Sequence, residues 1–246
     1  MAKARSDRMS DIISALEKAG GRTPRIKSDL AMDQLVALMF AAHASPRQAT
    51  KSVQALREEF VDWNEVRISY VREIIKPLER EGLPEPKARA RDLIDLFEQF
   101  YKDHNAVNIE LLVGEEVNLE ASFQYMKGLP GVDDAAAAGT VIANAEEGKA
   151  VAAPEVLRVP GRLGLAGRNA TPARIRKVLE ETLQGKDRLR AHYQFARLAA
   201  ETCVSRDPSC MECPLSKGCE YGQAQLKAGK GQPKPPPEPR AATKKP

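Results

Sequence analysis

Apolar residues recur at helical spacing along most of the chain. Leu35, Leu38, Met39 and Ala42 fall at positions i, i+3, i+4 and i+7, and similar stripes cover residues 93–101 and 175–183. The stripe at 175–183 follows a threonine and a proline at 171–172, an N-cap with proline at the first helical position. Two-residue alternation is scarce, and VNIELLV at 107–113 could be a short strand or a helical turn. The pattern therefore predicts an all-α protein, with loops near residues 20–21, 81–86, 148–154 and 160–167.

Charge is distributed unevenly along the chain. The 246 residues include 38 basic and 34 acidic side chains, a net charge of +4. Residues 227–246 hold six of the basic residues and one of the acidic ones, so this segment carries +5 and the other residues together carry −1. The same segment holds six prolines and is expected to be a disordered basic tail, a tether or a weak anchor on nucleic acid. No apolar run is long enough to span a membrane and the N-terminus lacks a signal-peptide pattern, so a cytoplasmic protein is expected.

All four cysteines lie close together near the C-terminal end of the chain. Cys203, Cys210, Cys213 and Cys219 have the spacing C-x6-C-x2-C-x5-C. Four thiols this close, without a secretory signal, favour a metal site over disulfides. Thiolate ligands suit either zinc or an iron–sulfur cluster, and the spacing alone does not separate the two. We expect the bound metal or cluster to stabilise this segment of the chain rather than to carry out redox chemistry.

A second motif lies at residues 128–140, which read GLPGVDDAAAAGT. A Leu-Pro-Gly-Val turn here runs into the start of an alanine-rich helix. Such a turn leaves backbone N–H groups free at a helix N-terminus, which is a natural site for a phosphate.

Together, the turn and the cysteines resemble the endonuclease III family of helix-hairpin-helix DNA glycosylases. The resemblance covers about residues 5–225, lapses near 105–125, and includes Arg158, Val159 and Arg162 between the two motifs. It implies a helical barrel with the hairpin over 30–147, an iron–sulfur helical domain over 1–29 and 148–226, and the tail at 227–246. It also implies that the cysteines hold a [4Fe–4S] cluster, with zinc as the alternative. The positions implied to contact DNA are His43, Leu129, Pro130, Gly131, Val132 and Asp133.

The two groups that carry the family's chemistry are missing at their matching positions. The nucleophilic lysine falls on Ala135 and the catalytic aspartate on Ala153, so no catalytic residue is assigned. Four nearby charged residues could act as relocated groups, although each is expected to be a surface charge: Asp133, Asp134, Lys149 and Glu155. Asp133 also replaces the second glycine of the hairpin, where its carboxylate would take the place of a DNA phosphate. Of the other histidines, we expect His192 to pack against neighbouring side chains or to cap a helix, and His104 to be exposed to solvent.

Three functions are compatible with these observations. The first is a non-catalytic DNA-binding or damage-sensing protein with a structural cluster, which contacts double-stranded DNA partly through the basic tail. The second is an active glycosylase or lyase with relocated catalytic groups. The third is a cluster-stabilised scaffold for a protein partner. The first is preferred, and it would place the protein in the cytoplasm on the nucleoid.

Overall fold

The computed structural model describes residues 2–24, 31–113, 117–144, 154–167 and 169–229. Within these ranges every regular element is a helix, which confirms the predicted all-α class. The elements in chain order are α1 (Ala2–Gly20), α2 (Ala31–Ala41), α3 (Pro46–Glu59), α4 (Trp63–Ile68), α5 (Val71–Arg80), α6 (Pro86–His104), the 3-10 turn η1 (Glu110–Leu112), α7 (Leu119–Met126), α8 (Asp134–Asn144), α9 (Pro154–Arg162), α10 (Pro172–Thr182), α11 (Lys186–Glu201), the 3-10 turn η2 (Ser216–Gly218) and α12 (Glu220–Lys227).

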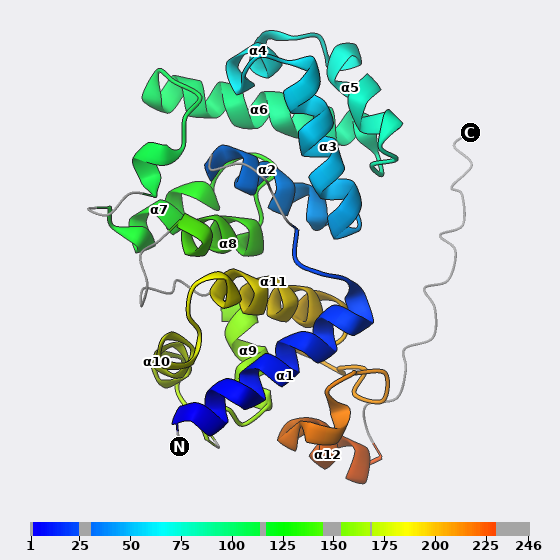
Figure 1. Cartoon of the computed structure of the whole chain (residues 1–246), viewed down its shortest axis with the longest axis vertical. Coiled ribbons are helices and arrows are strands. Elements are labelled where there is room, and N and C mark those ends of the chain that lie inside the picture. Colours follow the sequence, from blue (N-terminus) through cyan, green and yellow to red (C-terminus); the bar gives the residue numbers. More distant parts are fainter. Residues whose placement is uncertain (1, 25–30, 114–116, 145–153, 168, 230–246) are drawn as a thin grey trace, which may run out of the picture.

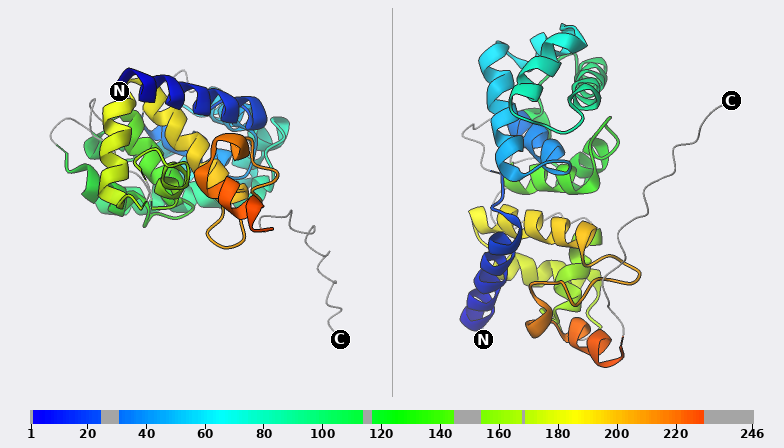
Figure 2. Two further views of the ribbon diagram at one scale, coloured as in Figure 1. Left: turned by 90° about the horizontal axis from the view of Figure 1, so that it is seen from below. Right: turned by 90° about the vertical axis from the view of Figure 1, so that its right-hand side faces the viewer.

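The helices pack in two lobes (Figures 1 and 2). Helices α2 to α8 form the upper lobe of Figure 1, and α1 with α9 to α12 form the lower one. Helix α11 joins the lobes, because it packs on both α8 and α9. The boundaries of the expected domains fall in the segments 25–30 and 145–153, which lie outside the described residues. The exact domain limits therefore stay a prediction.

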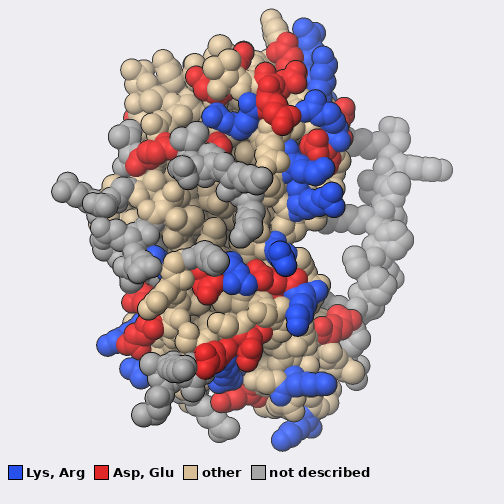
Figure 3. Space-filling model, in the orientation of Figure 1, with Lys and Arg blue, Asp and Glu red and all other residues tan. Residues whose placement is uncertain are grey.

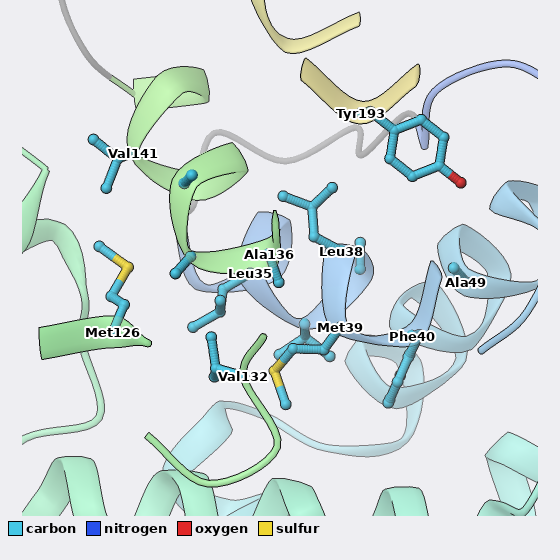
Figure 4. Close-up of a cluster of buried hydrophobic side chains, with 14 of the residues drawn as sticks. Leu35, Leu38, Met39, Phe40, Ala49, Met126, Val132, Ala136, Val141 and Tyr193 are labelled. Carbon is cyan, nitrogen blue, oxygen red and sulfur yellow. The ribbon is translucent and has the colours of Figure 1, made fainter. Parts of the chain in front are cut away.

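Helix α2 lies at the centre of the upper lobe. It is apolar on almost all sides, and residues 31–40 are buried apart from Gln34. Figure 4 shows Leu35 and Met39 of α2 beside Val132 and Ala136, which come from the hairpin and α8. A helix surrounded in this way must be enclosed by other helices to remove its surface from water. The core thereby fixes the hairpin against α2.

The predicted helical stripes match α2, α6 and α10, and the ambiguous segment 107–113 contains the 3-10 turn η1 and no strand. The predicted N-cap is confirmed, because the Thr171 side chain accepts a hydrogen bond from the Arg174 N–H at 3.3 Å. The predicted loop at 160–167 is partly wrong, since α9 continues through Pro160 to Arg162. Proline removes one helical hydrogen bond there. Long-range hydrogen bonds from Arg158 and Arg162, together with buried apolar neighbours, offset this loss.

No helix in the described part of the chain is long and apolar enough to cross a membrane. The final helix, α12, ends at Lys227, and residues 230–246 of the predicted basic tail lie outside the described residues.

Candidate functional site

The hairpin between α7 and α8 depends on one glycine. Gly131 has φ +72°, and a Cβ atom at this position would lie 2.9 Å from Asp92 Cβ and 3.2 Å from Met39 Cε. Both the backbone angle and the available space therefore require glycine. Leu129 and Val132, on either side of the turn, are buried in the upper lobe. The LPGV motif thus builds a turn whose apolar residues anchor it and whose Gly131 faces solvent.

Asp133 occupies the N-terminus of α8 with its own side chain. Its Oδ1 accepts a hydrogen bond from the Ala136 N–H at 2.6 Å, and the residue itself is exposed. Asp133 is not among the residues of positive φ, so its backbone does not require the glycine that it replaces. The neighbouring Asp134 pairs with Lys127 at 3.4 Å. Acidic side chains therefore stand where the sequence predicted a phosphate site.

Ala135 lies in the first turn of α8, where α8 meets α11 of the lower lobe. The His192 Nε2 of α11 lies 2.8 Å from the Ala135 carbonyl oxygen, and since a carbonyl only accepts, Nε2 carries the proton. Gly139 makes this approach possible, because a Cβ there would lie 3.3 Å from His192 Cδ2. His192 therefore bridges the two lobes, a more specific role than the packing or capping that we expected.

The buried imidazole of His192 has an incomplete set of hydrogen bonds. Burial lowers the pKa of His192, so the ring is neutral at pH 7. With the proton on Nε2, Nδ1 is an acceptor, and no described residue donates to it. A buried acceptor without a donor is costly, and such a group is a place where a ligand or water is expected.

A pocket of about 180 Å³ opens between the lobes beside this histidine. We call it the interlobe pocket. It lies where the C-terminal end of α2 and the N-terminal end of α8 meet α11, and Figure 4 shows three of its lining residues, Leu38, Ala136 and Tyr193. Half of the lining residues are alanines, and the others are Leu38, Asp133, His192, Tyr193, Arg197 and Glu201. Among the described residues, no lysine lines this pocket.

The remaining predicted positions are placed as follows. His43 is exposed in the turn that follows α2, directly after the pocket residues Ala41 and Ala42. Ala153, Lys149 and the side chain of Glu155 lie outside the described part of the chain. His104 was expected to be solvated, which is wrong. It is half-buried, and its ring packs 4.8 Å from that of Phe100.

All four cysteines line one small pocket, together with Arg162 of α9 and with Tyr221 and Gly222 of α12. Cys210 is buried and the other three are half-buried. Burial raises the pKa of the Cys210 and Cys213 thiols. Among the described residues, no group of three or more His, Cys, Asp or Glu side chains could hold a single metal ion.

Arg162 connects α9 to the cysteine loop. Its guanidinium donates to the carbonyl oxygens of residues 203, 204 and 205 at 3.2, 2.7 and 3.0 Å, and lies 3.3 Å from Cys203 Sγ. The same group stacks over the Tyr221 ring at 4.4 Å. Arg158 adds bonds to the carbonyls of Ala199 and Cys203. These contacts fix the start of the loop and place a positive charge beside a thiol.

Comparison with known proteins gives the same fold. No family model matches the sequence. An endonuclease III from Rickettsia felis is 28% identical over 189 residues, which cover 76% of this chain and 81% of that protein. A solved complex of endonuclease III with DNA aligns with a TM-score of 0.51 and 17% identity, and a thermostable thymine-DNA glycosylase with 0.54 and 19%. Both alignments cover 90% of this chain and 98% of the other.

The fold is that of endonuclease III. Within this endonuclease III fold, sequence reasoning found the hairpin and the cysteines but assigned no role to several residues that the structure brings to the two sites. Arg158 and Arg162 were matched without a function, and Tyr193 and Glu201 were not considered. The spacing of His192, Tyr193, Ala196 and Ala200 along α11 is a signal of one helical face that could have indicated the pocket.

Proposed function

We propose that this protein binds DNA and senses damage without carrying out glycosylase or lyase chemistry, and that a [4Fe–4S] cluster stabilises its C-terminal loop. The observation that carries the proposal is the interlobe pocket, whose lining includes Ala135 and no lysine among the described residues. An alanine methyl can neither attack a sugar nor form a Schiff base. The similarity to a DNA complex of endonuclease III supports DNA as the partner.

The other groups of the pocket do not replace the missing amine. The Nε2 proton of His192 is used by the Ala135 carbonyl, and the Asp133 carboxylate caps α8. The Arg197 guanidinium donates to the Leu16 carbonyl and to Gln194 Oε1, and it has no free amine that could attack a sugar. Loss of a nucleophile alone commonly costs about 10⁴-fold or more in rate. Binding without turnover is therefore the activity best supported by these residues.

The cysteine pocket supplies four thiols for a [4Fe–4S] cluster, with zinc as the alternative. A tetrahedral zinc site needs all four sulfurs at about 2.3 Å from one ion. A cluster distributes its thiolates over several irons. The resemblance to endonuclease III supports the cluster. When bound, it would supply a rigid cross-link of the loop, while the Arg162 guanidinium offsets part of the negative charge.

The charge of the chain indicates how DNA would be held. Figure 3 shows basic side chains gathered along one edge of the upper lobe, over α3 and α5, mixed with acidic ones, beside a hollow between the lobes. Residues 1–226 carry a net charge of −1 and the tail carries +5. We therefore assign to the tail a large share of the salt-dependent phosphate contacts. A location on the nucleoid follows from this proposal.

The test uses the full-length protein with duplexes that carry an abasic site or an oxidised base. Binding is measured against salt concentration, and borohydride is added to trap any Schiff base. Salt-dependent binding without trapping or strand cleavage is expected. Trapping or cleavage would overturn the non-catalytic part and support relocated catalytic groups. Absence of binding would overturn the proposal and favour a scaffold for a protein partner.

A second variant separates the tail from the folded lobes. A chain that ends at residue 226 is expected to bind more weakly and with a smaller salt slope, but to keep a preference for damaged over intact duplex. If all binding disappears, the lobes do not recognise DNA and damage sensing by the pocket is wrong. Iron and sulfide are measured on the anaerobically purified protein, and stoichiometric zinc would refute the cluster.

A further inference from the structure

Large apolar side chains are exposed around the short helix α4. Val61 precedes this helix, Ile68 is its last residue and Tyr70 follows it, and they are 86%, 67% and 69% exposed. In the described part of the chain, only one other large apolar residue, Met211, is as open to solvent. Apolar side chains that gather on a surface in this way mark a site of interaction.

The local backbone turns two of these side chains to the same side. Helix α4 buries Trp63 and Val66, which places Ile68 on the opposite, outer face of the helix. Ser69 and Tyr70 are extended, and residues two apart in an extended chain point to the same side. Ile68 and Tyr70 therefore face solvent together.

Val61 borders the same surface. The Glu65 carboxylate accepts a hydrogen bond from the Val61 N–H at 2.6 Å, and Glu65 lies beside Ile68 on the outer face of α4, one turn away. We call Val61, Ile68 and Tyr70 the α4 patch. The patch lies at the end of the upper lobe that is turned away from α11 and the lower lobe (Figure 1).

A row of basic side chains continues from the patch along α5. Arg72, Lys76 and Arg80 are exposed and follow one another at intervals of four residues, so they share one face of the helix. We call them the basic row. The Arg72 guanidinium lies over the Tyr70 ring, 4.9 Å from its centre, and so joins the row to the patch. Figure 3 shows basic side chains along this edge of the upper lobe.

The acidic side chains close to this surface are used by the protein itself. The Glu73 carboxylate accepts a hydrogen bond from the Tyr70 N–H at 3.0 Å, and Glu81 lies 3.7 Å from a lysine and an arginine. No carboxylate of a described residue pairs with Arg72 or Lys76. The surface therefore presents positive charge that is not neutralised, directly beside exposed apolar groups.

We propose that the α4 patch and the basic row bind a segment of a partner protein that carries both acidic and apolar side chains. The apolar side chains of such a segment would remove Val61, Ile68 and Tyr70 from water, while its carboxylates would meet Arg72 and Lys76. A nucleic acid would pair with the cations, but it has no aliphatic side chains to cover Val61 and Ile68. The Arg72 guanidinium also occupies one face of the Tyr70 ring, where a base would stack.

The experiment measures binding of a synthetic fluorescent peptide to the full-length protein by anisotropy. The probe is an amphipathic helix of about 15 residues with leucine on one face and glutamate on the other. One comparison peptide has serine in place of leucine, and the second has glutamine in place of glutamate. We expect the probe to bind with a Kd of about 10 μM at low salt and at least tenfold more tightly than either comparison peptide.

Paired variants of the protein test each half of the surface. Ile68→Ser combined with Tyr70→Ser should weaken binding of the probe at least tenfold, and serine is itself a good N-cap for α5. Ile68→Val combined with Tyr70→Phe keeps the surface apolar and should bind as the unmodified protein does. Lys76→Gln should weaken binding severalfold at low salt and less at high salt, whereas Lys177→Gln, at an exposed position of α10, should have no effect. Thermal unfolding of each variant shows that the fold is retained.

Three results would overturn the proposal: no binding of the probe, equal binding of the probe and the serine peptide, or unchanged affinity in the variant with two serines. Single-stranded oligothymidine is measured on the same proteins. If it binds more tightly than the probe and loses affinity in the variant with two serines, the surface is a nucleic-acid site and the proposal is wrong. The probe contains no DNA, so this outcome is independent of the proposed DNA-binding function.

Discussion

Replacing Arg162 tests how the cysteine loop is held. Its side chain donates to three successive carbonyls between Cys203 and Ser205, and stacks on Tyr221. Arg162→Gln is too short and uncharged to keep these contacts. Hydrogen bonds from a charged donor contribute about 1.5–3 kcal/mol each, and the cation–π contact about 0.5–1 kcal/mol.

The loop is partly open to solvent, so water replaces some of the lost bonds. We discount the sum accordingly and expect a loss of roughly 3 kcal/mol in the free energy of unfolding. For a chain of this size, that loss lowers Tm by about 6–12 °C. Thermal unfolding followed by circular dichroism measures it, and iron per chain should fall in parallel because the loop is less organised before the cluster binds.

Two further variants show whether the charge of Arg162 or the shape of its side chain holds the cysteine loop. Arg162→Lys keeps the positive charge but loses the planar fork and the stacking, so it should resemble Arg162→Gln. Arg206→Gln removes an exposed arginine from the same loop and should behave as the unmodified protein. If Arg162→Gln has the same Tm as Arg206→Gln within experimental error and keeps its iron, the contacts of Arg162 do not stabilise the loop and the reasoning is refuted.

Three other changes have definite expected outcomes. Gly131→Ala combines a left-handed backbone with a 2.9 Å contact to Asp92 Cβ, so it should destabilise the upper lobe by about 2–4 kcal/mol in urea unfolding; an unchanged midpoint would contradict the hairpin geometry. Folding lowers the pKa of His192, so its contribution to the free energy of unfolding should be fully present above pH 6.5. That free energy should fall as the pH drops below 6.5, by at most about 1.4 kcal/mol per pH unit. The His192→Gln variant should lack this pH dependence. Asp133→Gly should tighten binding to duplex DNA about tenfold at low salt, because like charges at about 4 Å repel by up to roughly 4 kcal/mol and solvent screens much of this; unchanged affinity would refute the phosphate-site argument.

Sequence reasoning succeeded where the determining interactions are local. The stripe at 35–42 predicts α2 because helical spacing is a property of neighbouring residues. The loop predicted at 160–167 was partly wrong because proline and glycine are local signals, whereas Arg162 holds α9 through bonds to residues more than forty positions away.

The interlobe pocket depends on contacts that no local pattern contains. His192 and Ala135 are 57 residues apart, and only the packing of α11 on α8 brings them together. The unpartnered Nδ1 and the shared position of Asp133 and Glu201 follow from the same packing. Local sequence patterns therefore could not predict this pocket, which depends on how the helices pack.

The changes at the start of α8 belong together. Asp133 satisfies the Ala136 N–H, Asp134 pairs with Lys127, and His192 binds the Ala135 carbonyl. Each contact engages a protein group at a position where the resemblance to endonuclease III implies a DNA phosphate or a nucleophilic lysine. This internal pairing supports the proposed function, in which the protein binds DNA without glycosylase or lyase chemistry.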